Sequence, residues 1–445
     1  MSDNVQYKIG MISLGCPKNQ VDAEIMLASL AQENFVLVDD VYSADIVIVN
    51  TCGFIEDAKK EAIENILEMT ELKKDGEISA VIVTGCLAQR YKDEILKEIP
   101  EVDAVVGLGA NSDIAKICRD ALEGKKANII PDISQLCMSG ERLLTTPEYW
   151  AYLKISDGCS NCCSYCAIPS IRGKFRSRKI EEILEEAKQL ADSGVKELVV
   201  IAQDTTRYGE DLYGELKLPE LLDKLCEIDG IHWIRLLYCY PDRLTDELMD
   251  TIAKQPKILN YIDLPLQHAD GEVLKRMNRS GNRKTLTELI NKLRSKIPDV
   301  VIRTTFITGF PGETEENFEQ LDEFVQEMKF DRLGCFAYSA EEGTPAASFE
   351  NQIDDEVKIH RGELIMQKQY DIFVEKNNER IGKTYEVIVD GYDGYTDTYF
   401  GRAYMDAPEI DSKIIFTSSS ALNEGEFVNV KIIDVEGYDL LGKKI

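Results

Sequence analysis

Short apolar runs alternate with amphipathic stretches along the first 125 residues of the chain. The apolar runs, which predict strands, lie at residues 9–14, 45–50, 80–84 and 102–106. Apolar residues recur with helical spacing between and after these runs, at residues 21–33 and 55–73, then up to about 98, and again at 111–122. Strands that alternate with helices predict an open parallel α/β sheet.

A second series of apolar runs begins near residue 149 and predicts six further strands. They lie at residues 151–156, 197–202, 233–238, 261–266, 301–308 and 332–338. Helical stretches separate them, for example at 181–193, 218–227 and 315–328. Six βα units are too few for a closed eight-stranded barrel, so we expect a partial, open (β/α)6 barrel.

The last part of the chain changes from helical to alternating periodicity. A long helical stretch at 354–378 is followed by alternating runs at 385–390, 400–405, 413–417 and 427–435. Gly-rich turns between these runs predict a small antiparallel β-barrel. We therefore expect an α/β protein with an N-terminal domain (1–125), a linker (126–148), a partial barrel (149–375) and a C-terminal β-barrel (376–445).

Length and composition bear on the number of domains, the cellular location and the state of the cysteines. A chain of 445 residues fits about three domains of about 150 residues each. The N-terminus lacks the charged-then-apolar order of a signal peptide, and no apolar run approaches the roughly 20 residues that span a bilayer. We expect a cytoplasmic protein without a membrane contact, whose 12 cysteines are metal ligands and reduced core thiols.

The net charge of −29 makes nucleic acid a poor candidate substrate, because nucleic-acid binding depends on neutralising phosphates. Residues 376–445 share this balance, with 8 Lys and Arg against 13 Asp and Glu. An acidic surface favours a basic protein partner instead.

Four cysteines lie in one short loop after a predicted strand, as Cys159-Ser-Asn-Cys162-Cys163-Ser-Tyr-Cys166. The loop allows two three-cysteine registers, with Cys163 or Cys162 as the middle residue. Three thiolates suit a four-iron cluster whose fourth iron has no protein ligand. The alternative is a structural zinc site, which would want a fourth Cys or His nearby, and the closest histidine is His232.

Three other cysteines, Cys16, Cys52 and Cys86, each follow a strand of the first predicted sheet at once. Ligands of open α/β sheets collect beyond the carboxyl ends of the strands, so we expect these thiols on one rim. Gly15 and Gly85 precede two of them and allow close backbone approach. This predicts a second three-cysteine metal site. The alternative is three buried core cysteines.

Residues 158–180 contain no acidic side chain but several basic ones, including Arg172. One hypothesis is that Arg172 receives a carboxylate, from a cofactor or a substrate. The alternative is a solvated basic loop. The remaining cysteines lie in or beside apolar stretches and are predicted core residues, namely Cys118, Cys137, Cys226, Cys239 and Cys335.

Several segments together carry a resemblance to a known family. They are Ser13-Leu-Gly-Cys16-Pro-Lys-Asn19, Cys166-Ala-Ile-Pro-Ser-Ile-Arg-Gly173, Gln203-Asp-Thr-Thr-Arg-Tyr-Gly209, Tyr261-Ile-Asp-Leu-Pro-Leu-Gln-His268 and Asp331-Arg-Leu-Gly-Cys-Phe-Ala-Tyr338. With them the chain resembles the radical-SAM methylthiotransferases along essentially its whole length, and the RimO branch most. The resemblance implies an N-terminal cluster-binding domain, a radical-SAM core and a β-barrel called TRAM.

The resemblance also implies cofactors and their ligands. Two 4Fe–4S clusters are implied, an auxiliary cluster on Cys16, Cys52 and Cys86 and a radical-SAM cluster on Cys159, Cys163 and Cys166. An aromatic residue before the last cysteine, here Tyr165, is as in the family and favours this register, with Cys162 as an extra. S-adenosyl-L-methionine is implied as radical source and methyl donor. Its candidate contacts are Tyr165, Gln203, Thr308 and Gly309.

The implied reaction adds a methylthio group to the β-carbon of an aspartate in the twelfth protein of the small ribosomal subunit. It needs an external electron donor. The alternative function is that of the sister branch, MiaB, which modifies adenosine in transfer RNA. A third hypothesis is a non-catalytic binding module stabilised by zinc. The acidic C-terminal barrel favours the ribosomal protein over RNA, because an RNA-gripping barrel would present a basic face.

Overall fold

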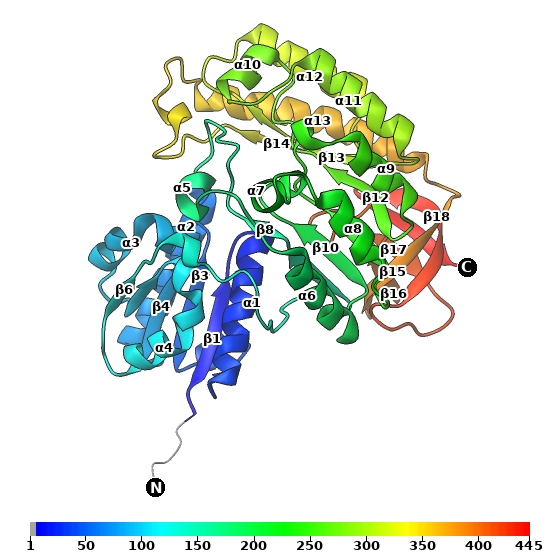
Figure 1. The fold of residues 1–445 in the computed structure, drawn as a ribbon. Coiled ribbons are helices and arrows are strands. Elements are labelled where there is room, and N and C mark those ends of the chain that lie inside the picture. The colour runs from blue at the N-terminus through cyan, green and yellow to red at the C-terminus, as the bar shows by residue number, and fades with distance from the viewer. Residues whose placement is uncertain (1–5) are drawn as a thin grey trace.

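The computed structural model describes residues 6–445, so that residues 1–5, with which the predicted first domain begins, lie outside the described part. Figure 1 shows an N-terminal unit in blue and cyan, a central unit in green and yellow, and a small C-terminal unit in red. Each unit contains its own sheet or barrel, as the changes of periodicity along the sequence predicted. None of the helices within the described residues is long and apolar enough to cross a membrane.

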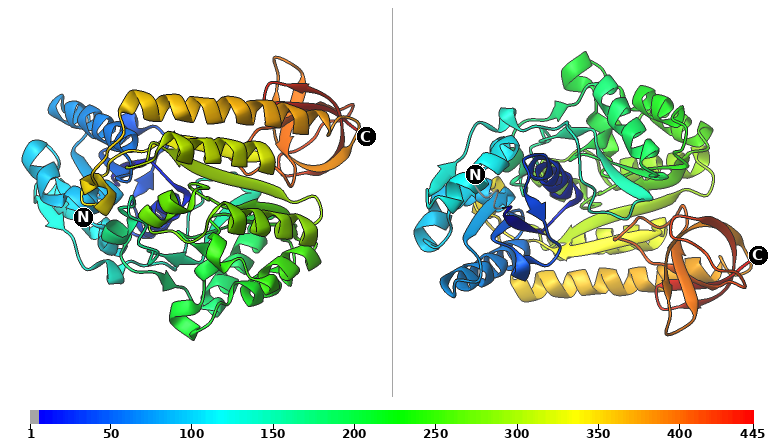
Figure 2. Two further views of the ribbon diagram at one scale, coloured as in Figure 1. Left: turned by 90° about the horizontal axis from the view of Figure 1, so that it is seen from above. Right: turned by 90° about the horizontal axis from the view of Figure 1, so that it is seen from below.

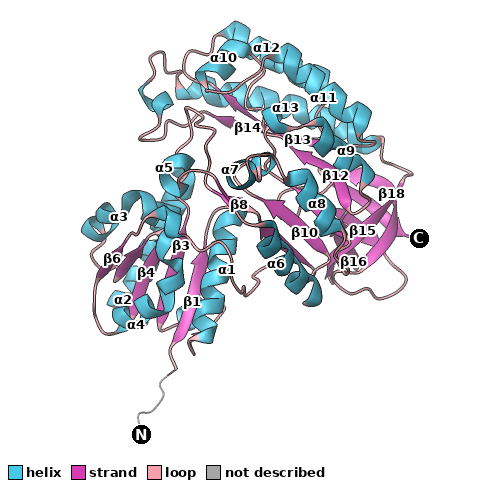
Figure 3. Cartoon of the chain, in the orientation of Figure 1, coloured by secondary structure: helices cyan, strands magenta, loops and turns pink. Residues whose placement is uncertain are grey.

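The N-terminal unit is a parallel sheet in the order β2-β1-β3-β4-β5-β6. Its strands are β1 (Lys8–Ser13), β2 (Val36–Leu37), β3 (Ile46–Thr51), β4 (Ala80–Gly85), β5 (Ala104–Val106) and β6 (Ala127–Ile129). Helices α1 (Pro17–Gln32) and α4 (Ile114–Leu122) cover one face, and α2 (Glu56–Lys74) and α3 (Cys86–Glu98) cover the other (Figure 3). The strands are apolar on both sides because helices bury both faces.

Two strands of this sheet were not expected from the sequence. Strand β2 has only two residues, and β6 lies inside the stretch predicted as a linker. Strand β6 pairs in parallel with β5, so the first sheet extends beyond residue 125. A short strand at the edge of a sheet leaves too few residues for a periodic signal.

The central unit is a parallel sheet of six strands in the order β14-β13-β12-β11-β10-β7. They are β7 (Trp150–Lys154), β10 (Glu197–Ile201), β11 (Trp233–Leu236), β12 (Ile258–Asp263), β13 (Val301–Thr308) and β14 (Arg332–Ala337). Strands β7 and β14 are the free edges, so the predicted partial, open barrel is confirmed. A hairpin of β8 (Ser156–Asp157) and β9 (Arg176–Ser177) flanks it.

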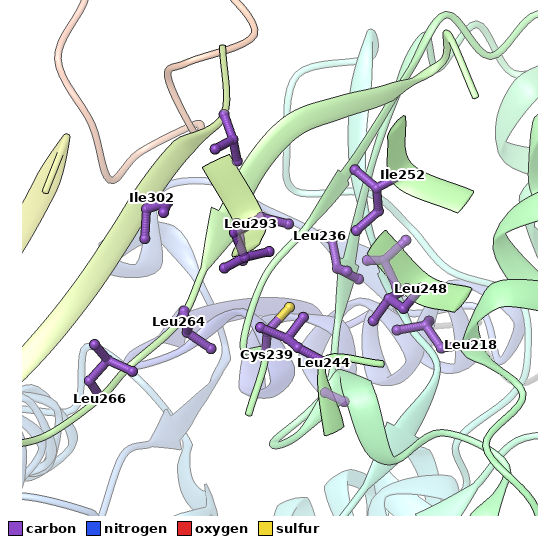
Figure 4. Packing of buried hydrophobic residues seen from close by; sticks show 14 of the residues in the cluster. Leu218, Leu236, Cys239, Leu244, Leu248, Ile252, Leu264, Leu266, Leu293 and Ile302 are labelled. Atoms are coloured by element: carbon purple, nitrogen blue, oxygen red, sulfur yellow. The ribbon is translucent and has the colours of Figure 1, made fainter. Parts of the chain in front are cut away.

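Helices pack against the outer face of this partial barrel and form the largest core of the protein. They are α6 (Ile180–Asp192), α8 (Leu218–Cys226), α9 (Asp246–Lys254), α11 (Arg283–Lys296) and α12 (Glu315–Met328). Figure 4 shows how leucines and isoleucines of strands and helices, such as Leu236, Leu248 and Ile302, fill the space between them. Shorter helices lie in the loops, namely α5 (Ile168–Arg172), α7 (Glu210–Tyr213) and α10 (Gly271–Arg276).

The C-terminal unit is a closed barrel of five strands, joined to the core by the long helix α13 (Asp355–Asn378) (Figure 2). The strands are β15 (Thr384–Asp393), β16 (Thr398–Arg402), β17 (Ile414–Thr417), β18 (Phe427–Glu436) and β19 (Asp439–Lys444). The sequence predicted an antiparallel barrel. The barrel is instead mixed, because β19 closes it by pairing in parallel with β17.

The N-terminal and C-terminal units contact opposite ends of the central barrel. At the amino end of the barrel strands, Glu197 on β10 pairs with Arg402 of the C-terminal barrel at 2.5 Å. At the carboxyl end, Lys154 at the end of β7 pairs with Asp22 of α1. The carboxyl rim of the central sheet therefore faces the N-terminal domain.

Candidate active site

Three cysteines of the N-terminal domain lie together beyond the ends of adjacent strands. Cys16 follows β1, Cys52 follows β3 and Cys86 begins α3 directly after β4, and these strands are neighbours in the sheet. The close approach of Cys16 and Cys52 requires a glycine at position 15. A Cβ atom on Gly15, which has φ +95°, would lie 2.7 Å from the Cβ atom of Cys52. The strand-end argument from the sequence therefore placed these three thiols correctly on one rim.

The loop after β8 sorts its four cysteines into two groups. Cys159, Cys163 and Cys166 line a cavity, whereas Cys162 is exposed and does not. Cys162 has a positive φ of 53°, which turns its side chain away, and its thiol faces the carbonyl oxygen of Ser160. Of the two registers that the sequence allowed, the structure brings together the one with Cys163.

Both groups of three cysteines open onto the same cavity of about 360 Å³ at the domain interface. It is lined from the N-terminal domain by Cys16, Lys18, Cys52, Phe54 and Cys86, and from the central unit by residues that include Cys159, Cys163, Cys166, Tyr165, Arg172, Gln203, Tyr238, Gln267 and Arg279. The prediction that the two rims share one chamber is confirmed. A larger hollow of about 980 Å³ lies between the central unit and the C-terminal barrel, but no cysteine lines it.

The surroundings of the thiols act on their ionisation in opposite directions. Burial raises the pKa of Cys86 and Cys166 to about 12, and that of Cys159 to about 11. Burial acts in the same direction on Cys16, but the positive charges of Lys18 and Arg172, together with hydrogen bonds from the backbone of Asn19 and Lys18, outweigh it and lower the pKa of this thiol. A bound metal ion would favour the thiolate form of all of them.

The donor set fits two iron–sulfur clusters. Each trio consists of thiols alone, which is the ligand type that such clusters require. Among residues 6–445, no group of three His, Cys, Asp or Glu side chains could hold a single metal ion. The thiolates of a four-iron cluster bind different iron atoms, so their sulfur atoms need not converge on one point.

Arg172 is not part of a solvated loop. It is 1% exposed, and its guanidinium donates to Asp22 of α1 at 2.9 Å and to Asp157 at 2.8 Å. The carboxylate that the sequence analysis assigned to Arg172 is therefore supplied by the protein itself. The contact with Asp22 joins the central unit to the N-terminal domain at the wall of the cavity.

Two of the four predicted contacts of S-adenosylmethionine line the cavity, and two do not. Tyr165 and Gln203 are in its wall. Thr308 is fully buried and donates to the carbonyl oxygen of Lys358, while Gly309 packs against the Lys358 side chain. Both lie where β13 meets α13. The turn after them leads to Thr314, whose side chain accepts a hydrogen bond from the backbone N–H of Asn317 and caps α12.

One of the remaining cysteines lacks the expected core role, and a second has another role in addition. Cys137 is exposed, so its prediction as a core residue is wrong, because the loop that contains it buries Leu136 instead. Cys239 is buried as expected but lines the cavity between the two trios.

Three functional candidates were missed by the sequence analysis, Lys18, Tyr238 and Arg279. Lys18 lies inside the motif around Cys16, and this position is the one feature of the sequence that could have marked it as a site residue. The other two reach the cavity from the loop after β11 and from the turn after α10, and no local pattern marks them.

Three family models match parts of the chain. The model described as the Radical SAM superfamily matches residues 153–325. The Uncharacterized protein family UPF0004 matches residues 8–107, and the TRAM domain matches residues 381–445. These ranges fall on the central unit, the N-terminal sheet and the C-terminal barrel, respectively.

Several relatives with full-length similarity carry the name ribosomal protein uS12 methylthiotransferase RimO. That from Clostridioides difficile is 52% identical over 436 residues, which make up 98% of this chain and 98% of the relative. That from Desulforamulus reducens is 52% identical over 438 residues, covering 98% of this chain and 99% of the relative.

Solved structures with a similar fold are more distant in sequence. The radical S-adenosylmethionine methyltransferase TsrM from Kitasatospora setae, with cobalamin and a 4Fe–4S cluster bound, has a TM-score of 0.57 at 14% identity and covers 77% of each chain. The cobalamin-dependent radical enzyme OxsB has a TM-score of 0.51 at 13% identity, covering 82% of this chain and 58% of its own. At such identity the likeness concerns the fold alone.

Proposed function

The chain belongs to the RimO family of radical-SAM methylthiotransferases, and from this membership we propose that it methylthiolates an aspartate of ribosomal protein uS12 at the β-carbon. The relatives that carry this name match the chain from end to end. The proposed target is a carbon atom whose hydrogen no general base could remove. This requirement is the reason for a radical enzyme.

One observation carries the proposal, namely the opening of both cysteine trios onto a single cavity. We assign the auxiliary cluster to Cys16, Cys52 and Cys86, and the radical-SAM cluster to Cys159, Cys163 and Cys166. Three protein ligands leave one iron of each four-iron cluster open. A target side chain that enters the cavity would therefore reach both open irons.

When bound, the clusters and S-adenosylmethionine supply hydrogen abstraction from an unactivated carbon, sulfur insertion and methyl transfer. The residues of the chain itself bind the cofactors and keep water away from the reacting groups. Apolar side chains such as Phe54, Ile168 and Pro265 line the cavity between the cysteines and exclude water from it. Tyr165 and Gln203 lie on the same wall as the Cys159 trio, where they can contact the cofactor.

The charge of the protein supports a basic protein as partner over a nucleic acid. With a net charge of −29, the surface repels phosphates and attracts a basic ribosomal protein. A ribosomal substrate places the reaction in the cytoplasm. The external electron donor would deliver its electron to the Cys159 trio.

The test is anaerobic incubation of iron- and sulfide-reconstituted protein with uS12, S-adenosylmethionine and a reductant. Mass spectrometry should find one added methylthio group on a single aspartate of uS12. Cys52→Ala and Cys166→Ala variants should each lose the product, because each removes one ligand of one cluster. A product on transfer RNA and none on uS12 would refute the proposal in favour of the MiaB-type reaction.

A further inference from the structure

Three cationic side chains line the cavity, and their partners differ. They are Lys18, Arg172 and Arg279. Arg172 is neutralised by Asp22 and Asp157 within 2.9 Å. A cation with two carboxylate partners has no need of a third from a ligand.

Arg279 is also engaged, on the side of the cavity that holds the Cys159 trio. Its guanidinium donates to the carbonyl oxygen of Pro265 at 2.7 Å and contacts the sulfur of Cys163 at 3.8 Å. It stacks on the ring of Tyr240, with 4.2 Å from the guanidinium carbon to the ring centroid. These contacts place Arg279 with the cofactor side of the cavity.

Lys18, like Arg279, has no carboxylate partner, but unlike Arg279 its side chain also donates to no carbonyl oxygen of the described residues 6–445. Its residue is 7% exposed, and no Asp or Glu among the described residues 6–445 forms an ion pair with it. Its ammonium group lies over the ring of Tyr238, 3.3 Å from the centroid. The ring of Tyr238 and the neighbouring Cys16 thiolate, whose charge a bound cluster would share, compensate only part of the cost of burying an ammonium group, so this site favours an anionic ligand.

The contact between Lys18 and Tyr238 spans the two domains in a fixed geometry. Lys18 lies in the first turn of α1, two residues after Cys16. Tyr238, after β11, has a positive φ of 60°, an unusual conformation for an aromatic residue. Its backbone N–H donates to Asp263 at 2.9 Å, which holds it in this conformation. Strain that the surrounding structure maintains is typical of functional sites.

We propose that Lys18 binds the side-chain carboxylate of the target aspartate and so selects aspartate as the residue to be modified. This inference rests on the proposed function. The carboxyl group is attached to the β-carbon that reacts, so an ion pair to Lys18 would hold that carbon within the cavity. Lys18 stands beside Cys16, on the side from which sulfur would be delivered. An asparagine of the same shape offers only a neutral carbonyl oxygen, so it would leave the ammonium charge without a counter-charge.

The test compares equilibrium binding of two uS12 peptides, one with the target aspartate and one with asparagine in its place, to the reconstituted protein. The unaltered protein should bind the aspartate peptide about 10- to 100-fold more tightly, as expected for a charged hydrogen bond. Lys18→Met should remove this discrimination, and Lys18→Arg should restore part of it. Lys188→Met, on an exposed face of α6, should bind both peptides as the unaltered protein does.

Equal affinity of the unaltered protein for the two peptides would overturn the assignment of Lys18, and so would a Lys18→Met variant that still discriminates. The first comparison needs no variant, so equal affinities would reject the role of Lys18 even if Lys18→Met fails to retain iron. The proposed function fails separately, if the unaltered protein neither binds nor modifies the aspartate peptide. Modification with no discrimination would keep the function and reject only the role of Lys18.

Discussion

Adjacent cysteines in the loop after β8 have different surroundings, and the backbone is the cause. Cys163 faces the cavity, whereas the positive φ of Cys162 directs its side chain to the surface. A left-handed conformation at one residue is invisible in the spacing of a motif. The sequence therefore left two registers open, and the local dihedral angle separates them.

We expect Cys163→Ala to lose the radical-SAM cluster and Cys162→Ala to retain it. The Cys163 sulfur is a proposed iron ligand, and the Cys162 sulfur lies outside the cavity. Iron and sulfide analysis of the anaerobically reconstituted variants measures the difference directly. Cys162→Ala is the matched control, and iron content that falls equally in both variants would contradict the assignment.

The buried pairing of Arg172 with Asp22 and Asp157 gives a second prediction. Arg172→Met would leave two fully buried carboxylates with Lys154 as their remaining cation, and should lower the free energy of unfolding by about 3–5 kcal/mol. Chemical denaturation followed by circular dichroism measures this change.

The control is Arg119→Met, which breaks an exposed pair with Glu33. Exposed pairs contribute about 0–1 kcal/mol, so this variant should unfold nearly as the unaltered protein does. Similar unfolding curves for Arg172→Met and the control would show that the buried pairing does not hold the domains together.

At the scale of elements, the junction of β13 with α13 is packed without free space. A Cβ atom on Gly309, which has φ +69°, would lie 2.0 Å from the Lys358 Cγ atom and 3.0 Å from its Cα atom. Gly343 has a similar φ of +76° with nothing within 4 Å. The two glycines therefore separate the cost of the backbone conformation from the cost of the steric clash.

Gly343→Ala should lower the free energy of unfolding by about 1–2 kcal/mol, the cost of a left-handed conformation for alanine. Gly309→Ala should cost about 1–3 kcal/mol more, because α13 must also move. Thermal unfolding of the two variants gives the comparison. An equal decrease in the free energy of unfolding for both variants would mean that α13 can shift at this junction without an energetic cost.

Long, periodic elements could be predicted from the sequence, and short or non-local ones could not. The six strands of the partial barrel and helix α13 follow from apolar runs of ordinary length. Strand β6 has three residues, and β19 closes the C-terminal barrel through a parallel pairing that no local pattern encodes. Pairing of this kind depends on residues distant in the chain.

The candidate site divides in the same way. The cysteines could be placed because strand ends of a parallel sheet meet at one rim. Lys18 and Tyr238 come into contact only because two domains dock against each other, and no pattern in the sequence predicts this docking. Thr308 and Gly309 stand at the end of β13 as expected, but their contacts are with Lys358 of α13.

At the scale of the whole molecule, the net charge of −29 should influence how the substrate arrives. Long-range attraction between an acidic enzyme and basic uS12 accelerates their encounter and is screened by salt. We expect kcat/KM for intact uS12 to fall by about tenfold or more between about 0.05 and 0.5 M salt.

A short target peptide without net charge is the control, and its kcat/KM should change little over the same range. A rate for intact uS12 that is independent of salt would exclude electrostatic steering by the acidic surface.

One wall of the cavity comes from each domain, so any molecule that spans it acts as a clamp between two separately folded bodies. Binding energy gained in the chamber then opposes separation of the two domains and reduces exposure of the connecting segment at 130–148 to proteases. A spectator peptide that fits the chamber would therefore protect that segment from cleavage without any turnover.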